Sequence, residues 1–414
     1  MIAPLTRSIS DAFFARTADP ETSPGHRLTR ALCAIRTHLG MDVAFVSEFE
    51  GGRRYFRQVD ASHPRSPVKV GASDPLEESY CQRVVDGRLP ELMRDARLFE
   101  AALEIAATLT LPVGAHLSVP IRLRNGDVYG TFCCFSFTPD HSLNERDLGM
   151  MRVFADLAAE QIEDDVAAQR SRAEITRRID AVLADDSLSM VFQPIYQTRE
   201  GRVVGFESLA RFAAQPPRTP DVWFREAAQI GRGASLEIEA VRRGLRALDH
   251  LPADTYVSFN ASPETILGGD LAAALDPWPL DRVVMEVTEH AVIHHYSDLA
   301  AVVGPWRGRG LRVAVDDAGA GYASFRHILR LAPDLIKLDM SITRDIDTDL
   351  SRRALGGALV SFAQATGSRI IAEGVETAAE LAALRQLGIE KAQGYFLGRP
   401  MPLADAVGLT GPVD

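Results

Sequence analysis

The sequence predicts an α/β protein in which a TIM-type barrel of eight strands follows a smaller α+β domain and a long connecting helix. Short apolar strands alternate with helical stretches across residues 187–410, which is the order of βα units. Residues 24–140 instead contain helices and glycine-turned hairpins. Residues 141–186, between these regions, contain one glycine and no proline, as a long helix requires. We therefore expect two domains joined by a helix.

Length and composition set the broad class of the protein. A chain of 414 residues suits two or three domains, and the net charge of -11 argues against a nucleic-acid polymer as the partner. The sequence has no apolar run of membrane-spanning length, and its first residues lack the pattern of a signal peptide. We therefore expect a cytoplasmic protein with no membrane partner. Its four cysteines are expected to be reduced core thiols.

The first region predicts an α+β domain on a mainly antiparallel sheet. An amphipathic helix, HRLTRALCAIRTHLG, is expected to end at Gly40. Two hairpins follow, one turning at Gly51-Gly52 and the other at Asn125-Gly126. The second hairpin contains the run FCCF, so Cys133 and Cys134 should point to opposite faces of the sheet.

The connecting helix is expected to begin with the capping pattern SLNE at Ser142. An apolar stripe runs along it, formed by Met151, Phe154, Leu157 and Ile162 and continued more weakly by Val166, Ile175, Ile179 and Val182. A helix of this length needs a packing partner, because propensity alone does not stabilise it. Two partners remain open: a second copy in a parallel coiled coil, or the domains of the same chain.

Eight candidate strands follow, with the sequences MVFQPIY, VVGFESLARF, YVSFNAS, VVMEVTEH, LRVAVDD, LIKLDMS, RIIAEGVE and KAQGYFL. After the first strand, each carries a polar residue within or at the carboxyl end of its apolar run. These residues are Glu207, Asn260, Glu286, Asp316 with Asp317, Lys337, Glu373 and Gln393. The carboxyl ends of barrel strands meet on one face, where TIM-barrel active sites lie. We therefore expect these side chains to share one site.

The residue types in this set indicate metal chemistry. Carboxylates and an amide oxygen form an all-oxygen ligand set, which Mg²⁺ and Mn²⁺ prefer, and the set contains no cysteine or histidine. The adjacent carboxylates Asp316 and Asp317 can serve two ions, and paired ions are the usual device for displacement at phosphorus. Lys337 would orient a water molecule or neutralise phosphoryl charge.

The third region resembles the EAL domain, the phosphodiesterase of cyclic di-GMP. The resemblance is carried by ESL at Glu207, NAS at Asn260, EVTE at Glu286 to Glu289, DDAGAGYAS, LIKLD, AEGVET and QGYFLGRPMP. It implies metal-dependent hydrolysis of cyclic di-GMP to linear 5′-pGpG, with two Mg²⁺ or Mn²⁺ ions per barrel. No cyclase signature occurs in the chain, so we expect no synthesis of the dinucleotide.

The resemblance also implies a role for each matching residue. The metal ligands would be Glu207, Asn260, Glu286, Asp316, Asp317 and, through water, Glu373. Lys337 and Glu373 would position or deprotonate the attacking water, and Glu289 would anchor the loop after Asp317. The expected substrate contacts are Gln193, Arg211, Glu376 and Gln393.

The chain departs from the family pattern at four small residues, Ser208, Ala318, Ala320 and Ala323. Ala318 replaces a phenylalanine in the loop that couples metal binding to the dimer contact in the family. None of the four changes removes a metal ligand. The alternative to an enzyme is therefore a catalytically weak or inactive receptor of cyclic di-GMP, and a barrel that serves only as a scaffold is disfavoured by its buried acids.

The first region resembles a GAF domain in the stretches DPLEESYCQRVVDGRLPELMRDA and VPIRLRNGDVYGTFCCFS. The resemblance implies a sensor or dimerisation domain at 24–140, with the ligand unidentified. Cys81 is followed by Gln82, whereas bilin-binding members often carry histidine after the attachment cysteine. Ligand sensing and dimerisation both remain open, and we expect a homodimeric signalling protein in which the helix at 141–186 connects the sensor to the EAL barrel at 187–410.

Overall fold

The computed structural model describes residues 24–287, 295–318 and 322–410. The chain divides into two compact units, and the division falls between Ser171 and Arg172. Each unit has its own hydrophobic core, and each is described by itself below. Across the described ranges, no helix combines the length and the apolar character that a membrane crossing requires.

The first unit is built on a six-stranded antiparallel sheet with the strand order β3-β2-β1-β6-β5-β4. The strands are β1 (Val43–Glu50), β2 (Arg53–Ala61), β3 (Ser73–Pro75), β4 (Leu92–Met93), β5 (His116–Arg122) and β6 (Val128–Phe135). Both predicted hairpins are confirmed, β1 with β2 and β5 with β6. Gly51, Gly52 and Gly126 adopt positive φ at the two turns, a conformation that glycine adopts without a steric penalty.

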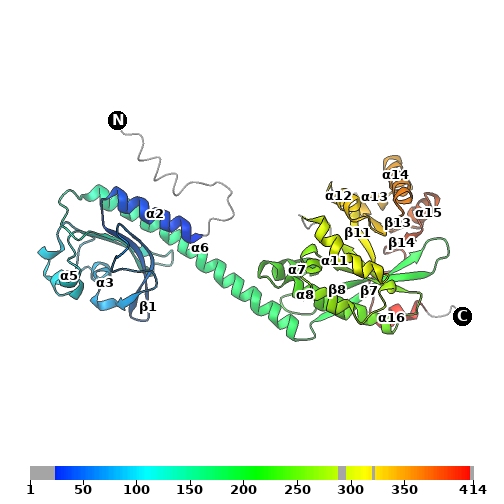
Figure 1. The fold of residues 1–414 in the computed structure, drawn as a ribbon, viewed down its shortest axis with the longest axis horizontal. Helices are drawn as coiled ribbons and strands as arrows, with labels where there is room; N and C mark the ends of the chain where they lie inside the picture. Colours follow the sequence, from blue (N-terminus) through cyan, green and yellow to red (C-terminus); the bar gives the residue numbers. More distant parts are fainter. Residues whose placement is uncertain (1–23, 288–294, 319–321, 411–414) are drawn as a thin grey trace. The chain divides into compact units, whose positions relative to one another are not determined.

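Two layers of helices cover this sheet (Figure 1). Helix α2 (Pro24–His38) and the first half of α6 (Glu145–Ala184) share one apolar cluster, which contains Cys134. The short helices α3 (Tyr80–Val85), α4 (Glu100–Leu103) and α5 (Ala106–Thr110) contribute to a second cluster, which contains Cys133. The two adjacent cysteines therefore point to opposite faces, as strand alternation predicts.

Helix α6 begins at Glu145, two residues later than a cap at Ser142 predicts. Asn144 is the capping residue: its side chain accepts from the amide of Arg146, and the Asp147 carboxylate accepts from the amide of Asn144. This reciprocal arrangement satisfies two backbone donors of the first turn, which explains why the helix starts there.

The apolar stripe of α6 packs on the chain's own units. Met151, Phe154 and Ile162 lie in the core of the first unit. Ile179 and Val182 lie in a cluster of the second unit with Trp223. Residues 167–174 between these two stretches are exposed. Packing on the chain's own domains is thus what the structure shows for this helix, and the homodimer remains a prediction.

The second unit is a closed eight-stranded barrel with the order β10-β11-β12-β13-β14-β7-β8-β9. Its strands are β7 (Leu188–Gln197), β8 (Val203–Phe212), β9 (Tyr256–Ala261), β10 (Val283–Val287), β11 (Arg312–Ala318), β12 (Leu335–Leu338), β13 (Arg369–Ala372) and β14 (Lys391–Ala392). The predicted barrel is confirmed with one difference, because β7 runs antiparallel to both β8 and β14. Residues 198–202, which join β7 to β8, are too few for the crossover that a parallel pair needs.

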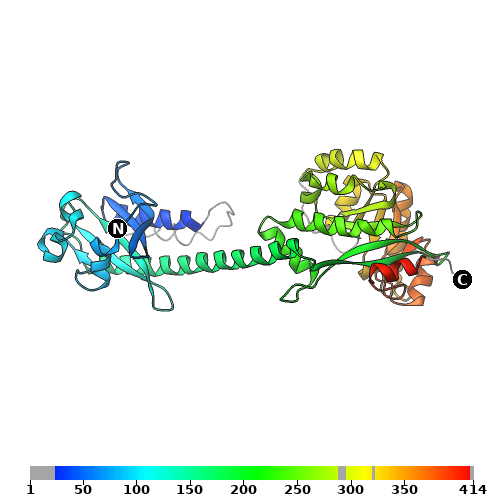
Figure 2. The ribbon, with the colours of Figure 1, turned by 90° about the horizontal axis from the view of Figure 1, so that it is seen from below.

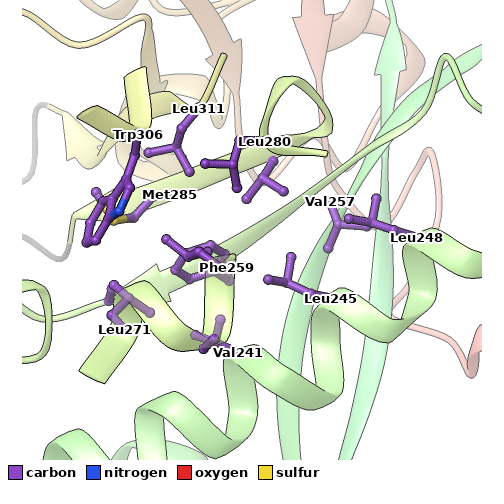
Figure 3. Packing of buried hydrophobic residues seen from close by; sticks show 14 of the residues in the cluster. Val241, Leu245, Leu248, Val257, Phe259, Leu271, Leu280, Met285, Trp306 and Leu311 are labelled. Carbon is purple, nitrogen blue, oxygen red and sulfur yellow. The ribbon is translucent and has the colours of Figure 1, made fainter. Parts of the chain in front are cut away.

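Helices surround the barrel (Figure 1). They are α7 (Pro220–Gln229), α8 (Gly233–Leu245), α9 (Pro263–Leu267), α10 (Asp270–Leu275), α11 (Tyr296–Gly308), α12 (Tyr322–Leu331), α13 (Met340–Thr343), α14 (Leu350–Thr366), α15 (Ala378–Gln386) and α16 (Leu403–Gly408). Figure 3 shows how strand and helix side chains pack together: Phe259 of β9 and Met285 of β10 meet Val241 of α8 and Trp306 of α11. The helix near the carboxyl end, α16, lies beside the β7–β8 hairpin (Figure 2).

A cationic cluster lies at the end of the barrel where its parallel strands begin. The ring of Tyr256 is faced by the Arg312 guanidinium at 4.5 Å and by the Lys391 ammonium at 4.7 Å. Lys391 is buried, and this burial together with Arg312 and Arg369 lowers the pKa of its ammonium to about 8. The folded barrel therefore disfavours the charged form of Lys391.

Replacing Lys391 by methionine is expected to raise the free energy of unfolding by about 1–2 kcal/mol at pH 7. The charged form is penalised in the fold below about pH 8, and the penalty disappears above the unfolded pKa of about 10.5. The gain should therefore shrink as the pH rises through that interval. Urea denaturation at pH 7 and at pH 10.5 measures it. If Lys391→Met and the wild type unfolded at the same urea concentration at pH 7, this account of the cationic cluster would be contradicted.

Candidate active site

A polar layer lies directly above an apolar layer inside the barrel. The apolar layer includes Val284, Ala314, Leu335 and Ile371, one from each of four consecutive strands. Two residues further along the chain are Glu286, Asp316, Lys337 and Glu373, of which Glu373 directly follows the last residue of β13. Because side chains two residues apart on a strand point to the same face, all four polar side chains point into the barrel. Strand periodicity thus assembles the site towards the carboxyl ends of these strands.

Lys337 is the centre of this polar layer. Its ammonium lies 2.5 Å from Glu286 Oε2, 2.8 Å from Glu373 Oε1 and 3.1 Å from Asp316 Oδ1. A fourth carboxylate oxygen, Glu207 Oε2, is 3.4 Å away. Lys337 and Glu286 are fully enclosed, whereas the side chains of Asp316 and Glu373 keep 18% and 17% of their surface exposed. The partly exposed pair therefore marks the side of the site that solvent or a ligand can reach.

A hydrogen-bonded amide network continues the site towards β7. Gln393 donates to Glu207 Oε2 at 2.6 Å and to the side-chain oxygen of Gln193 at 3.0 Å. Asn260 donates to Glu207 Oε1 at 3.3 Å. The strand register explains these contacts, because Gln193 lies opposite Glu207 in the β7–β8 hairpin, and Asn260 lies on β9, the parallel neighbour of β8, two residues beyond the partner of Glu207. The network fixes the orientation of Glu207.

Burial and mutual charge shift the titration of this cluster. Burial raises the pKa of Glu286 to about 8, although Lys337 opposes the shift. Burial likewise raises the pKa of Glu373 well above its ordinary value. Burial alone would lower the pKa of Lys337, but Asp316, Glu207, Glu286 and Glu373 together raise it well above its ordinary value. The ammonium is therefore held in its charged form by surrounding acids.

The donor chemistry of the cluster fits a hard divalent cation. The side chains of Glu207, Asn260, Glu286 and Asp316 offer only oxygen ligands once the amide of Asn260 turns its oxygen inward. Glu286 Oε1 is buried and has no hydrogen-bond partner in the described part of the chain. Within the same residues, no group of three or more His, Cys, Asp or Glu side chains is arranged to hold a metal ion. The four carboxylates converge on Lys337, which supplies one positive charge among them.

Two further residues expected at the site, Arg211 and Glu376, contact residues outside this cluster. Arg211 is exposed and donates to the carbonyl of its neighbour Ala210, and Glu376 is exposed and pairs with Arg344 at 2.8 Å. The side chain of Asp317 and all of Glu289 lie outside the described residues. Ala318 is buried as the last residue of β11 and pairs with Leu338 of β12, whereas the sequence placed it in a loop.

One contact of the site could not be predicted from the sequence. Gln193 donates to the carbonyl oxygen of Gly398, about two hundred residues away in the chain, at 3.2 Å. Close by, Phe192 and Met401 form a two-way backbone bridge. The segment GRPM therefore holds β7 against the rest of the barrel. Its Gly-Arg-Pro pattern signals a turn but does not indicate which strand it contacts.

Comparison with known proteins is consistent with this geometry. Residues 148–400 match the EAL domain model and residues 23–162 match the GAF domain model, which confirms both resemblances. The chain is 31% identical over 234 residues to the cyclic di-GMP phosphodiesterase NbdA of Pseudomonas aeruginosa, and 30% identical over 264 residues to the probable cyclic di-GMP phosphodiesterase PdeA of Escherichia coli. These alignments cover 54% and 60% of this chain but only 30% and 35% of the respective relatives.

Among solved structures, the PaMucR phosphodiesterase in its c-di-GMP complex is similar to this chain with a TM-score of 0.51 and 24% identity. The match covers 56% of this chain and 99% of that chain. At this identity the similarity concerns the fold, and it supports the barrel described above.

Proposed function

The chain belongs to the EAL domain family, and from this premise we propose that it hydrolyses one phosphodiester bond of cyclic di-GMP to give linear 5′-pGpG. The observation that carries the proposal is the enclosed cluster of four carboxylates around Lys337, in which one oxygen of Glu286 has no partner in the described part of the chain. Burying this many acids destabilises a fold unless cations balance them. Relatives named as cyclic di-GMP phosphodiesterases support the substrate.

Two divalent ions, Mg²⁺ or Mn²⁺, belong to the proposal. Glu207, Asn260, Glu286 and Asp316 would hold one ion, and Asp316, Asp317 and, through water, Glu373 would hold the other. When bound, such ions lower the pKa of water and stabilise the charge that develops on phosphoryl oxygens. Their donor set consists only of oxygen atoms, which suits both ions equally.

The chain's own residues would act on the water and on the phosphodiester. Glu373, with its raised pKa and partly exposed carboxylate, is suited to accept the proton of the attacking water. Lys337 pairs with Glu373 at 2.8 Å and would help to neutralise the charge that develops on the phosphoryl oxygens. Gln193 of β7 and Gln393, which directly follows β14, would contact the substrate, and the exposed Arg211 and Glu376 would also do so.

The first unit would regulate this activity. The GAF-like domain at 24–140 would respond to a ligand or mediate homodimer formation, and the helix at 141–186 would connect it to the barrel at 187–410. The polar, exposed middle of α6, residues 167–174, is the stretch of the helix that a second copy could contact without displacing packed side chains.

An inactive receptor of cyclic di-GMP is the second candidate function, and Ala318 is the observation that favours it. The family pattern has phenylalanine at this position, and here a small side chain ends β11 next to the aspartates. A receptor would bind the dinucleotide without cleaving it.

Turnover of cyclic di-GMP by the purified protein tests the proposal. The assay is run with Mg²⁺, with Mn²⁺ and with a chelator, beside an Asp316→Ala control. Formation of 5′-pGpG that requires the metal and is absent in the control is the expected result. Binding of the dinucleotide without cleavage under both metal conditions would favour the receptor, and neither binding nor cleavage would refute both functions.

A further inference from the structure

Two cysteines of the first unit meet inside its core, away from the barrel. Cys81 lies on α3 and Cys133 on β6, and their sulfur atoms are 3.5 Å apart. Both side chains are completely buried in the cluster beneath α3, α4 and α5. Cys133 Sγ also contacts the hydroxyl groups of Ser118 at 3.0 Å and Thr131 at 3.1 Å. Polar atoms therefore surround the pair within an otherwise apolar core.

A buried guanidinium adjoins the first of these sulfur atoms. Arg54 Nη1 lies 3.0 Å from Cys81 Sγ, and the rest of its head group is paired with Asp74. The guanidinium also lies over the rings of Phe45 and Phe56, at 5.6 Å and 4.7 Å from their centroids. These contacts hold a cation against Cys81, an arrangement that favours the thiolate.

The two thiols consequently differ in acidity. Burial would raise the pKa of Cys81, but the hydrogen bond from Cys133 and the charge of Arg54 lower it to about 5. Burial and the neighbouring Cys81 raise the pKa of Cys133 well above its ordinary value. The contacts of Cys81 Sγ with Arg54 and Cys133 therefore favour the thiolate at Cys81, with Cys133 as the neighbouring thiol.

We propose that Cys81 and Cys133 are an oxidative modification site, at which a hydroperoxide converts the pair into a reversible disulfide within the first unit. The proposal is independent of the phosphodiesterase activity, because it rests on the contacts of Cys81, Cys133 and Arg54 alone. Within the described residues, no third His, Cys, Asp or Glu side chain completes a metal site with the pair. The sulfur atoms must approach from 3.5 Å to about 2.05 Å.

The reaction balances with hydrogen peroxide as the oxidant. The Cys81 thiolate attacks one peroxide oxygen, the O–O bond breaks, and the leaving hydroxide takes a proton from solvent to become water. Cys81 is then a sulfenic acid. The Cys133 sulfur attacks the Cys81 sulfur, the S–O bond breaks, and the hydroxyl leaves with the Cys133 proton as a second water. The two thiols lose two electrons in total, and the peroxide gains them.

The oxidant reaches the buried pair by way of Arg54. Asp74, its carboxylate partner, lies on the edge strand β3 and keeps 39% of its side-chain surface exposed. The three-residue strand β3 is held by one neighbour only, so it can open locally without unfolding the sheet. Such an opening withdraws Asp74 and admits a molecule as small as peroxide, while Arg54 keeps its contact with Cys81.

Peptide mapping of the full-length protein after peroxide treatment tests the proposal. We expect a peptide pair linked through Cys81 and Cys133, lighter by two hydrogens than the reduced peptides and cleaved by dithiothreitol. Cys134 provides a matched control, since it adjoins Cys133 in the chain but points to the other face, 3.8 Å from the Met151 sulfur. The Cys134→Ser variant should form the link as the wild type does. The Cys133→Ser variant should instead accumulate a sulfenic acid on Cys81 that dimedone traps.

Oxidation rates provide a second test of the proposal, in a variant that keeps both thiols. The Arg54→Gln variant should oxidise about tenfold more slowly than the wild type at pH 7, because Cys81 loses the cation that favours its thiolate. Oxidation of the exposed Cys33 shows that the oxidant acted. Absence of the Cys81–Cys133 link in wild-type protein whose Cys33 is oxidised would overturn the proposal, and so would equal oxidation rates in the wild type and Arg54→Gln.

Discussion

Exchanging Glu286 for glutamine is expected to lower the turnover of cyclic di-GMP by about a hundredfold to a thousandfold. Oε2 of this fully buried carboxylate contacts Lys337 at 2.5 Å, and its Oε1 has no partner in the described part of the chain. A glutamine of the same shape must point its amide hydrogens either at the ammonium or into the position proposed for the metal. Both orientations place a donor against a cation, so the site cannot hold the ion as before.

Glu390→Gln is the matched control for this substitution. Glu390 is exposed, and it immediately precedes β14, at the opposite end of the barrel from the carboxylate cluster. It carries the same functional group, so its replacement makes the same chemical change on the exposed surface. Turnover and metal titration of the two variants are compared with the wild type at equal protein concentration. Wild-type activity in Glu286→Gln would refute the role of Glu286 as a metal ligand.

Exchanging Lys337 for methionine is expected to abolish turnover and to destabilise the barrel by about 3–5 kcal/mol at pH 8 without divalent ions. Four carboxylates lie within 3.4 Å of the Lys337 ammonium, and methionine fills the space without balancing their charge. Added Mg²⁺ or Mn²⁺ should restore part of the lost stability, because a bound cation replaces the missing charge. Urea denaturation with and without the metal measures both effects.

The pH dependence of this deficit follows from the raised pKa of Glu286, about 8, and of Glu373. The fold disfavours the ionised form of a carboxyl group whose pKa is higher in the folded protein than in the unfolded protein. The stability that this group contributes is therefore complete below its unfolded pKa, and it is lost as the pH rises through its folded pKa. The deficit should therefore be greatest above pH 8 and smallest near about pH 5. Lys391→Met is the matched control, since it removes the other buried lysine of the barrel and should stabilise the fold. The charge balance described here would be contradicted if Lys337→Met lost the same stability above pH 8 and near about pH 5. It would also be contradicted if Lys337→Met and Lys391→Met changed the stability equally.

Most of the barrel could be predicted from the sequence because strand periodicity is a local property. The run VVMEV has to alternate between the two faces of the sheet wherever it lies, so Val284 and Glu286 share the barrel interior. The antiparallel direction of β7 also follows from a local feature, the short connection at residues 198–202. The prediction missed it because all eight strands were interpreted as βα units. Recognising a connection too short for a crossover would have found the hairpin.

The partners of each site residue could not be predicted in the same way. Sequence placed Lys337 with the catalytic residues, but it did not show that this ammonium is shared by four acids at once. Nor did it show that Arg211 lies exposed against its own neighbour while Gln393 connects Gln193 to Glu207. These facts depend on which strands are adjacent and on how far each side chain reaches.

The fold class, the positions of the strands and the polar residues at their ends could be predicted from the sequence, because each depends on patterns within a few residues. What those polar residues contact could be learned only from the three-dimensional structure. Barrel closure brings Gln193 and Gln393, two hundred positions apart, within 3.0 Å, and sheet packing brings Arg54 to Cys81 and Cys81 to Cys133. The physical reason is that burial, charge balance and acidity arise from neighbours in space, which a linear pattern does not identify.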